Sequence, residues 1–261
     1  MVSPHPPRCC AFYGSHHLYK TYMYGKRMLL ALALCSITII TRAQSVQHNY
    51  QQWYTYFGNM KFAPHWAIHF DAQARIRNGF SDKGQFLLRP GIQYVQNSKI
   101  NYTLGYAYAP TYNDATGRWF PEHRIFEQFI YRDQEKHFDM HHRIRLEQRW
   151  VGQKNVHGDI ASWKYGNRFR YFNRTYLPLA LKPEKGSYYL ALQNEIFINL
   201  WGNAINPKVF DQNRFLVAPG YMTAAGVRLE AGYMNQFIQA PTGAKTMNHI
   251  LHLSVLHSFA L

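Results

Sequence analysis

The stretch 142–150 alternates two kinds of side chain, which restricts it to one type of secondary structure. Charged residues take every second position, mostly apolar residues lie between them, and the charged set is Arg143, Arg145, Glu147 and Arg149. A period of two belongs to a β-strand, because successive side chains point to opposite faces of a sheet. An α-helix would spread the same charges around its circumference. The stretch therefore predicts a strand with one ionic face and one mostly apolar face.

Alternating segments of this kind recur along most of the chain. The clearest is 66–77, in which six apolar residues alternate with six that are mainly polar. Eleven segments fit the pattern: 50–62, 66–77, 85–96, 100–109, 122–132, 142–150, 163–173, 187–199, 214–222, 227–237 and 247–259. We expect ten to twelve strands, since single-chain bacterial barrels normally have an even number. The stretch 173–185 is where a strand is most easily missed or falsely divided.

One segment, 122–132, departs from the alternation. Its aromatic Phe126 shares a face with the polar Arg124 and Gln128. A β-bulge, which adds one residue to one strand of a pair, would restore the phase. We therefore expect a bulge within this segment.

The N-terminal region predicts export. Lys26 and Arg27 precede an apolar run at 28–40, and small residues then lead to a cleavage site between Ala43 and Gln44, so that residues 23–43 form a signal peptide. The run is shorter than the about 20 residues of a membrane-spanning helix. Residues 1–22 are interpreted as an over-extended gene start and are expected to be disordered. All three cysteines lie before the cleavage site, so residues 44–261 cannot form disulfides.

The predicted mature chain, 44–261, has no apolar run long enough for a helical span. Weakly patterned strands separated by turn residues are instead typical of an all-β fold, an antiparallel transmembrane β-barrel of about 10–12 strands. We expect it in the cell outer membrane, in contact with outer-membrane lipid and placed there by the barrel insertion machinery. A soluble barrel or sandwich is the alternative, because it alternates in the same way. Export, the lack of cysteine and the number of similar strands favour the membrane barrel.

The ionic faces are expected to line the lumen, because each arginine facing lipid at mid-depth costs about 2–4 kcal/mol. Paired guanidinium and carboxylate groups would fill a narrow lumen. An excess of arginine favours instead a water-containing lumen, constricted at 143–149, that passes or holds small anions. Export argues against nucleic acid as a partner, despite a net charge of +15. The predicted lumen ionic network comprises Asp71, Arg75, Arg77, Arg143, Arg145, Glu147, Arg149, Arg168, Arg170, Arg174, Glu195, Arg214, Arg228 and Glu230.

Neither a metal site nor a cofactor is predicted. His141 and His142 are adjacent and would point to opposite faces of a strand. The nucleophile-elbow, phosphate-loop and zinc-protease motifs are absent from the sequence. His252 and Ser254 share a strand face but would lie about 6–7 Å apart, too far for direct activation. Two alternatives to an anion-preferring pore or binding barrel stay open: a lipid hydrolase or acyl-transfer enzyme, and a closed structural barrel that binds a partner through its loops.

Several strand motifs resemble one bacterial family. They are Glu122-His-Arg-Ile-Phe-Glu-Gln, the stretch 142–150, Arg168-Phe-Arg-Tyr, Asn194-Glu-Ile-Phe and Phe210-Asp-Gln-Asn-Arg. The segments that carry them resemble the exported proteins catalogued as domain of unknown function 2490, and the likeness covers about residues 44–261. The resemblance implies an outer-membrane β-barrel and implies no activity.

The predicted location can be tested by membrane fractionation combined with N-terminal sequencing. We expect the protein in the outer-membrane fraction with Gln44 as its first residue, because the signal peptide is removed during export. Recovery of the protein from the soluble periplasm would contradict the membrane barrel.

Overall fold

The computed structural model describes residues 46–135, 138–182 and 186–260. Residues 1–22, the predicted signal peptide and its cleavage site at Ala43 and Gln44 lie outside the described residues. Within the described ranges, no helix is long and apolar enough to cross a membrane. Strands account for most of the described chain, which confirms the all-β class.

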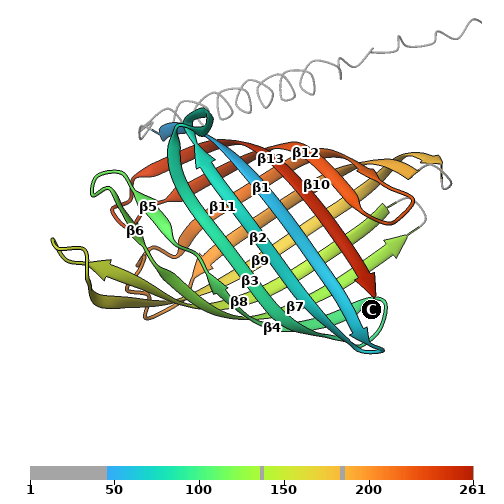
Figure 1. Ribbon diagram of the computed structural model, residues 1–261, viewed down its shortest axis with the longest axis horizontal. Helices are drawn as coiled ribbons and strands as arrows, with labels where there is room; N and C mark the ends of the chain where they lie inside the picture. Colours follow the sequence, from blue (N-terminus) through green and yellow to red (C-terminus); the bar gives the residue numbers. More distant parts are fainter. Residues whose placement is uncertain (1–45, 136–137, 183–185, 261) are drawn as a thin grey trace, which may run out of the picture. The chain divides into compact units, whose positions relative to one another are not determined.

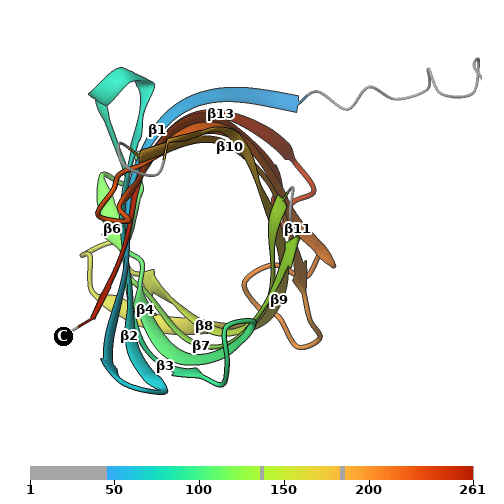
Figure 2. The same cartoon turned by 90° about the vertical axis from the view of Figure 1, so that its right-hand side faces the viewer.

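Eleven long strands close into a β-barrel, seen as a ring in Figure 2. A small hairpin of β5 (Thr111–Asn113) and β6 (Arg118–Phe120) adjoins β3. The barrel strands are β1 (Val46–Ala63), β2 (Trp66–Arg77), β3 (Asp82–Val95), β4 (Ile100–Tyr108), β7 (Glu122–Glu135), β8 (Phe138–Lys154), β9 (Ile160–Lys182), β10 (Gly186–Asn199), β11 (Phe210–Met222), β12 (Arg228–Gln239) and β13 (Lys245–Ala260).

The barrel closes through β1 and β13, which lie side by side in Figure 1 and run in the same direction. Their register extends from Val46 opposite Lys245 to Lys61 opposite Ala260. All the other pairs of neighbouring barrel strands are antiparallel. Strands that alternate in direction leave the first and last parallel when their number is odd. The predicted range of 10–12 strands is confirmed. The observed number, eleven, is odd, whereas single-chain bacterial barrels usually have an even number of strands.

Each of the eleven predicted segments corresponds to one barrel strand, although most strands extend further than their segments. β9 continues unbroken through 173–182, so this part of the stretch 173–185 adds no further strand. The expected bulge in 122–132 is wrong, because β7 pairs with β8 without a register shift. Phe126 is instead an inward-facing ring. It fits because Gly105 on β4 has no side chain: a Cβ there would lie 2.3 Å from the Phe126 ring.

The two faces of the barrel differ in polarity as the strand pattern requires. Ile144 and Leu146 point outward on β8 and are each 41% exposed, whereas Arg145 and Glu147 are each 1% exposed. We call the end with the connections 78–81, 109–121 and 200–209 the loop end, and the end with the turns 64–65 and 96–99 the turn end. β1 begins at the loop end and β13 finishes at the turn end.

Engineered disulfides test the parallel closure, since residues 46–261 contain no cysteine. Double cysteine variants at Tyr50 with His249 and at Tyr56 with Val255 should cross-link on mild oxidation, because each pair is in register. The swapped pairs, Tyr50 with Val255 and Tyr56 with His249, are controls about 20 Å apart at 3.3 Å per residue. Gel mobility with and without reductant gives the result. Cross-linking of the swapped pairs alone would show an antiparallel closure.

Candidate functional site

A run of ion pairs with alternating charge crosses the inner face of β8 to β11. Arg168 binds Asp211 at 2.8 Å and Glu147 at 2.6 Å. Arg170 then joins Glu147, at 2.5 Å, to Glu195, at 2.6 Å. Arg168 and Arg170 are two residues apart on β9, so both point into the barrel. Glu147, the carboxylate in the middle of the run, therefore accepts charge-assisted hydrogen bonds from two guanidinium groups.

Arg145, the most deeply buried of the predicted arginines, lies beside this run. Its Nε donates to Gln128 at 3.0 Å, and its guanidinium lies 4.5 Å from the centre of the Phe126 ring. The nearest carboxylate among the described residues, that of Glu147, is 3.7 Å away. An amide and an aromatic face thus replace the close carboxylate that a buried cation normally has.

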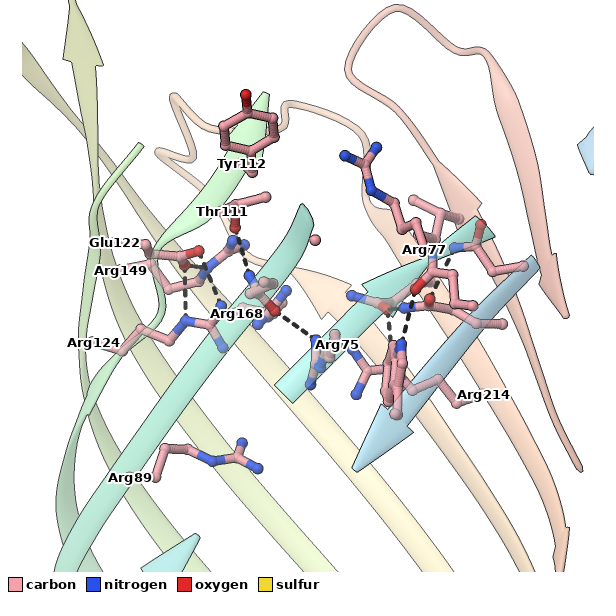
Figure 3. A pocket seen from close by; sticks show the side chains of 18 of the residues that line it. Arg75, Arg77, Arg89, Thr111, Tyr112, Glu122, Arg124, Arg149, Arg168 and Arg214 are labelled. Atoms are coloured by element: carbon pink, nitrogen blue, oxygen red, sulfur yellow. Dashed lines mark hydrogen bonds and ion pairs between the residues drawn. The ribbon is translucent and has the colours of Figure 1, made fainter. Parts of the chain in front are cut away.

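A second cluster lies toward the loop end. Glu122 accepts hydrogen bonds from the Nε atoms of Arg124 at 2.8 Å and Arg149 at 2.6 Å, and Figure 3 shows it between these two side chains. Elsewhere in the lumen, Asp71 binds Arg89. The prediction from sequence omitted four of the charged residues described so far: Arg89, Glu122, Arg124 and Asp211. The phase of 85–96 could have identified Arg89, whereas Asp211 precedes the predicted segment 214–222.

Arg174, Glu230 and Ser254 come together toward the turn end. Glu230 binds Arg174 and accepts hydrogen bonds from Ser254 at 2.9 Å and Tyr189 at 3.0 Å. His252 has a different partner, the Thr55 hydroxyl at 3.3 Å. Ser254 is thus engaged with a carboxylate and not with His252, which gives the enzyme alternative no support from this pair.

The first cavity, of about 330 Å³, opens toward the loop end and is shown in Figure 3. Its charged lining is strongly one-sided, because eight arginines face it and Glu122 is its one lining carboxylate among the described residues. The arginines are Arg75, Arg77, Arg89, Arg124, Arg149, Arg168, Arg170 and Arg214. A cavity lined in this way attracts anions and repels cations.

Two of these arginines stack on Trp53. The Arg75 guanidinium lies 3.8 Å from the centre of the indole, and that of Arg214 lies 5.0 Å from it. Arg75 donates to the amide oxygens of Gln73 and Gln85. Arg214 donates to the amide oxygen of Gln212, and the closest carboxylate oxygen among the described residues, on Glu195, is 4.0 Å away. Both guanidinium groups therefore keep capacity to bind an added anion.

The second cavity, of about 160 Å³, lies toward the turn end. Trp53, Arg89, Arg170 and Arg214 line both cavities and therefore form the layer between them. The charged residues of 143–149, predicted to form one constriction, lie in three different places. Arg149 lines the first cavity and Arg143 lines the second, whereas Arg145 and Glu147 lie in the buried ion-pair region.

The remaining predicted lumen residues lie near the two openings. Arg77 binds Asp114 in the β5–β6 connection at 2.6 Å, and this hydrogen bond lowers the pKa of the Asp114 carboxyl. The hairpin is thereby tied to the rim of the first cavity. Arg228 stacks on Tyr176 with 4.6 Å between the guanidinium and the ring centre. Within the described ranges, no group of three or more His, Cys, Asp or Glu side chains is arranged to hold a metal ion.

The variant Glu147→Gln tests the ion-pair run. We expect it to lower the free energy of unfolding by about 3–5 kcal/mol, because it leaves buried guanidinium charge without its carboxylate. Urea unfolding of the purified protein in detergent measures the effect. Glu127→Gln is the matched control, since Glu127 lies exposed on the outer face and accepts a hydrogen bond from Gln148. Equal unfolding midpoints for the two variants would contradict a stabilising role for the run.

Comparison with known proteins agrees with the motifs. A protein of Methylorubrum extorquens whose function is uncharacterised is 28% identical over 238 residues, which cover 88% of this chain and 96% of the relative. No solved structure matches the chain. The family described as protein of unknown function (DUF2490) matches residues 50–248. The chain therefore belongs to this family.

Proposed function

We propose that the protein is an outer-membrane β-barrel that takes up small anions through its loop end and passes them in preference to cations. The observation that carries the proposal is the first cavity, whose lining has eight arginines and one carboxylate. Ion pairing inside the barrel neutralises only part of this excess, because Arg75 and Arg214 have amide and indole neighbours at short distance. A small anion entering the cavity replaces water at these guanidinium groups.

The outer surface supports a location in lipid. Large apolar side chains point outward along the strands, for example Leu104, which is 60% exposed. Aromatic rings lie at both ends of the barrel: Trp66 packs against Tyr94 at the turn end, and Trp163 packs against His123 at the loop end. Tyrosine and tryptophan are favoured at membrane–water interfaces because the ring enters the lipid boundary while its polar atom reaches water.

Permeation is expected to be slow. The layer formed by Trp53, Arg89, Arg170 and Arg214 separates the two cavities, and three of its four side chains are cationic. An anion that crosses the layer exchanges one guanidinium for the next, whereas a cation meets repulsion throughout. A barrel of eleven strands is also intermediate between the side-chain-filled barrels of about eight strands and the aqueous channels of 16 or more.

Planar-bilayer recording with a salt gradient tests the proposal. The unmodified protein should show small current steps with a reversal potential on the anion-selective side. The double variant Arg75→Gln, Arg214→Gln should shift that potential toward zero, because it removes the two guanidinium groups with the weakest carboxylate pairing. Replacement by glutamine keeps a hydrogen-bonding side chain at both positions.

The control is Arg118→Gln, which removes an arginine that binds the Asn155 carbonyl and does not line the first cavity. It should leave the reversal potential unchanged, since the charge it removes does not face the first cavity. A cation-selective current, or an equal shift in both variants, would contradict the proposal. Absence of current at several salt concentrations would favour the closed barrel that binds a partner through its loops.

A further inference from the structure

The second cavity combines cationic groups with apolar walls, which distinguishes it from the first. Five arginines line it, and Glu195 is its one lining carboxylate among the described residues. The apolar part of its lining includes Phe57, Ile130, Phe172 and Met234. A hydrated inorganic ion gains nothing from such walls, whereas an organic anion can bury carbon against them. The chemistry of the cavity therefore matches an amphipathic ligand.

Several buried nitrogen atoms around this cavity lack a partner. The Nε atoms of Arg143 and Arg174 and the Nδ1 atom of His252 have no hydrogen bond to any described residue. Arg174 and His252 are each only 5% exposed, and all three residues line the cavity. A buried donor without an acceptor costs about 1–3 kcal/mol. A carboxylate supplies two acceptor oxygens and a compensating charge.

The volume and the lining limit the ligand further. An apolar cavity of about 150 Å³ can hold benzene, and the second cavity has about 160 Å³. Two aromatic side chains of β9, Phe172 and Tyr176, line the cavity. The Arg143 guanidinium lies 4.2 Å from the centre of Phe172, and Tyr176 is edge-on to Tyr189 at 5.5 Å. A six-membered ring can pack against these faces and edges.

We propose that the second cavity is a binding site for a small aromatic monocarboxylate, about the size of benzoate. The carboxylate lies at Arg143 and Arg174, and the ring lies against Phe172 and Met234. The second cavity lies nearer the turn end than the first, so we expect this ligand to reach its site from the turn end. The site is separate from the inorganic-anion site of the first cavity, although the two share a wall.

Binding of 4-fluorobenzoate to the full-length mature protein in detergent micelles tests the site, with fluorine NMR line width as the readout. The unmodified protein should show saturable broadening. Arg143→Gln should weaken the affinity about tenfold or more, because it removes one charge-assisted partner. This variant should still fold, since Glu195 keeps Arg170 at 2.6 Å. Arg143→Lys, which keeps the charge, should lose less affinity.

A cavity-filling variant, Met234→Trp, should abolish binding by occupying the space for the ring. Ile130→Trp serves the same purpose if the first substitution prevents folding, because Ile130 is only partly buried. Glu127→Gln on the outer face should bind like the unmodified protein. Folding of each variant is checked by the heat-dependent gel mobility of the barrel.

Three outcomes would overturn the inference. Equal broadening in the unmodified and cavity-filling proteins would mean that the probe only partitions into the micelle. Equal affinity for the neutral 4-fluorobenzyl alcohol would remove the role of the guanidinium groups. Displacement of the probe by chloride at equal concentration would show a general anion site without an apolar contribution. None of these results depends on a membrane current, so the inference and the proposed function can fail separately.

Discussion

The structure depends on keeping arginine charge stable inside a closed barrel. A guanidinium held away from water is costly unless carboxylates or other acceptors surround it. Glu147 and Glu195 meet this requirement by each accepting from more than one arginine on β8 and β9. Because the partners come from different strands, the ion pairs also tie neighbouring strands together. Removing one carboxylate therefore affects several strand contacts at once.

The same constraint explains how the lumen is divided. Where carboxylates and arginines interleave, the side chains pack closely and Arg145 and Glu147 are almost fully buried. Where carboxylates are scarce, Arg75 and Arg214 use the face of Trp53 and the amides of glutamine instead. These weaker arrangements lie beside the first cavity and in the layer between the two cavities. The excess of arginine around the first cavity thus follows from an unequal supply of acidic side chains.

The parallel contact of β1 and β13 has consequences for the whole barrel. It satisfies the edge groups of both strands, so neither is left free to pair with another chain. It also puts the start of β1 and the end of β13 at opposite ends of the barrel. An even number of strands would have placed both at the same end. The loop end of the barrel therefore holds the start of β1, and the turn end holds the end of β13. The two ends of the barrel also differ in the length of their connections.

The strand pattern alone determined that the chain is all-β, where each of the eleven strands lies and which face of β8 is ionic, because side-chain direction alternates locally along a strand. It did not determine the parallel closure, which depends on how the first and last strands meet. It also led us to expect a bulge at 122–132 that the structure lacks, since the inward ring of Phe126 fits in the space left by Gly105 on the next strand. The partners of Arg75, Arg145 and Arg214 likewise came only from the tertiary structure. Alternation along a strand predicts the face to which a side chain points, whereas the register between strands determines which residues that side chain contacts.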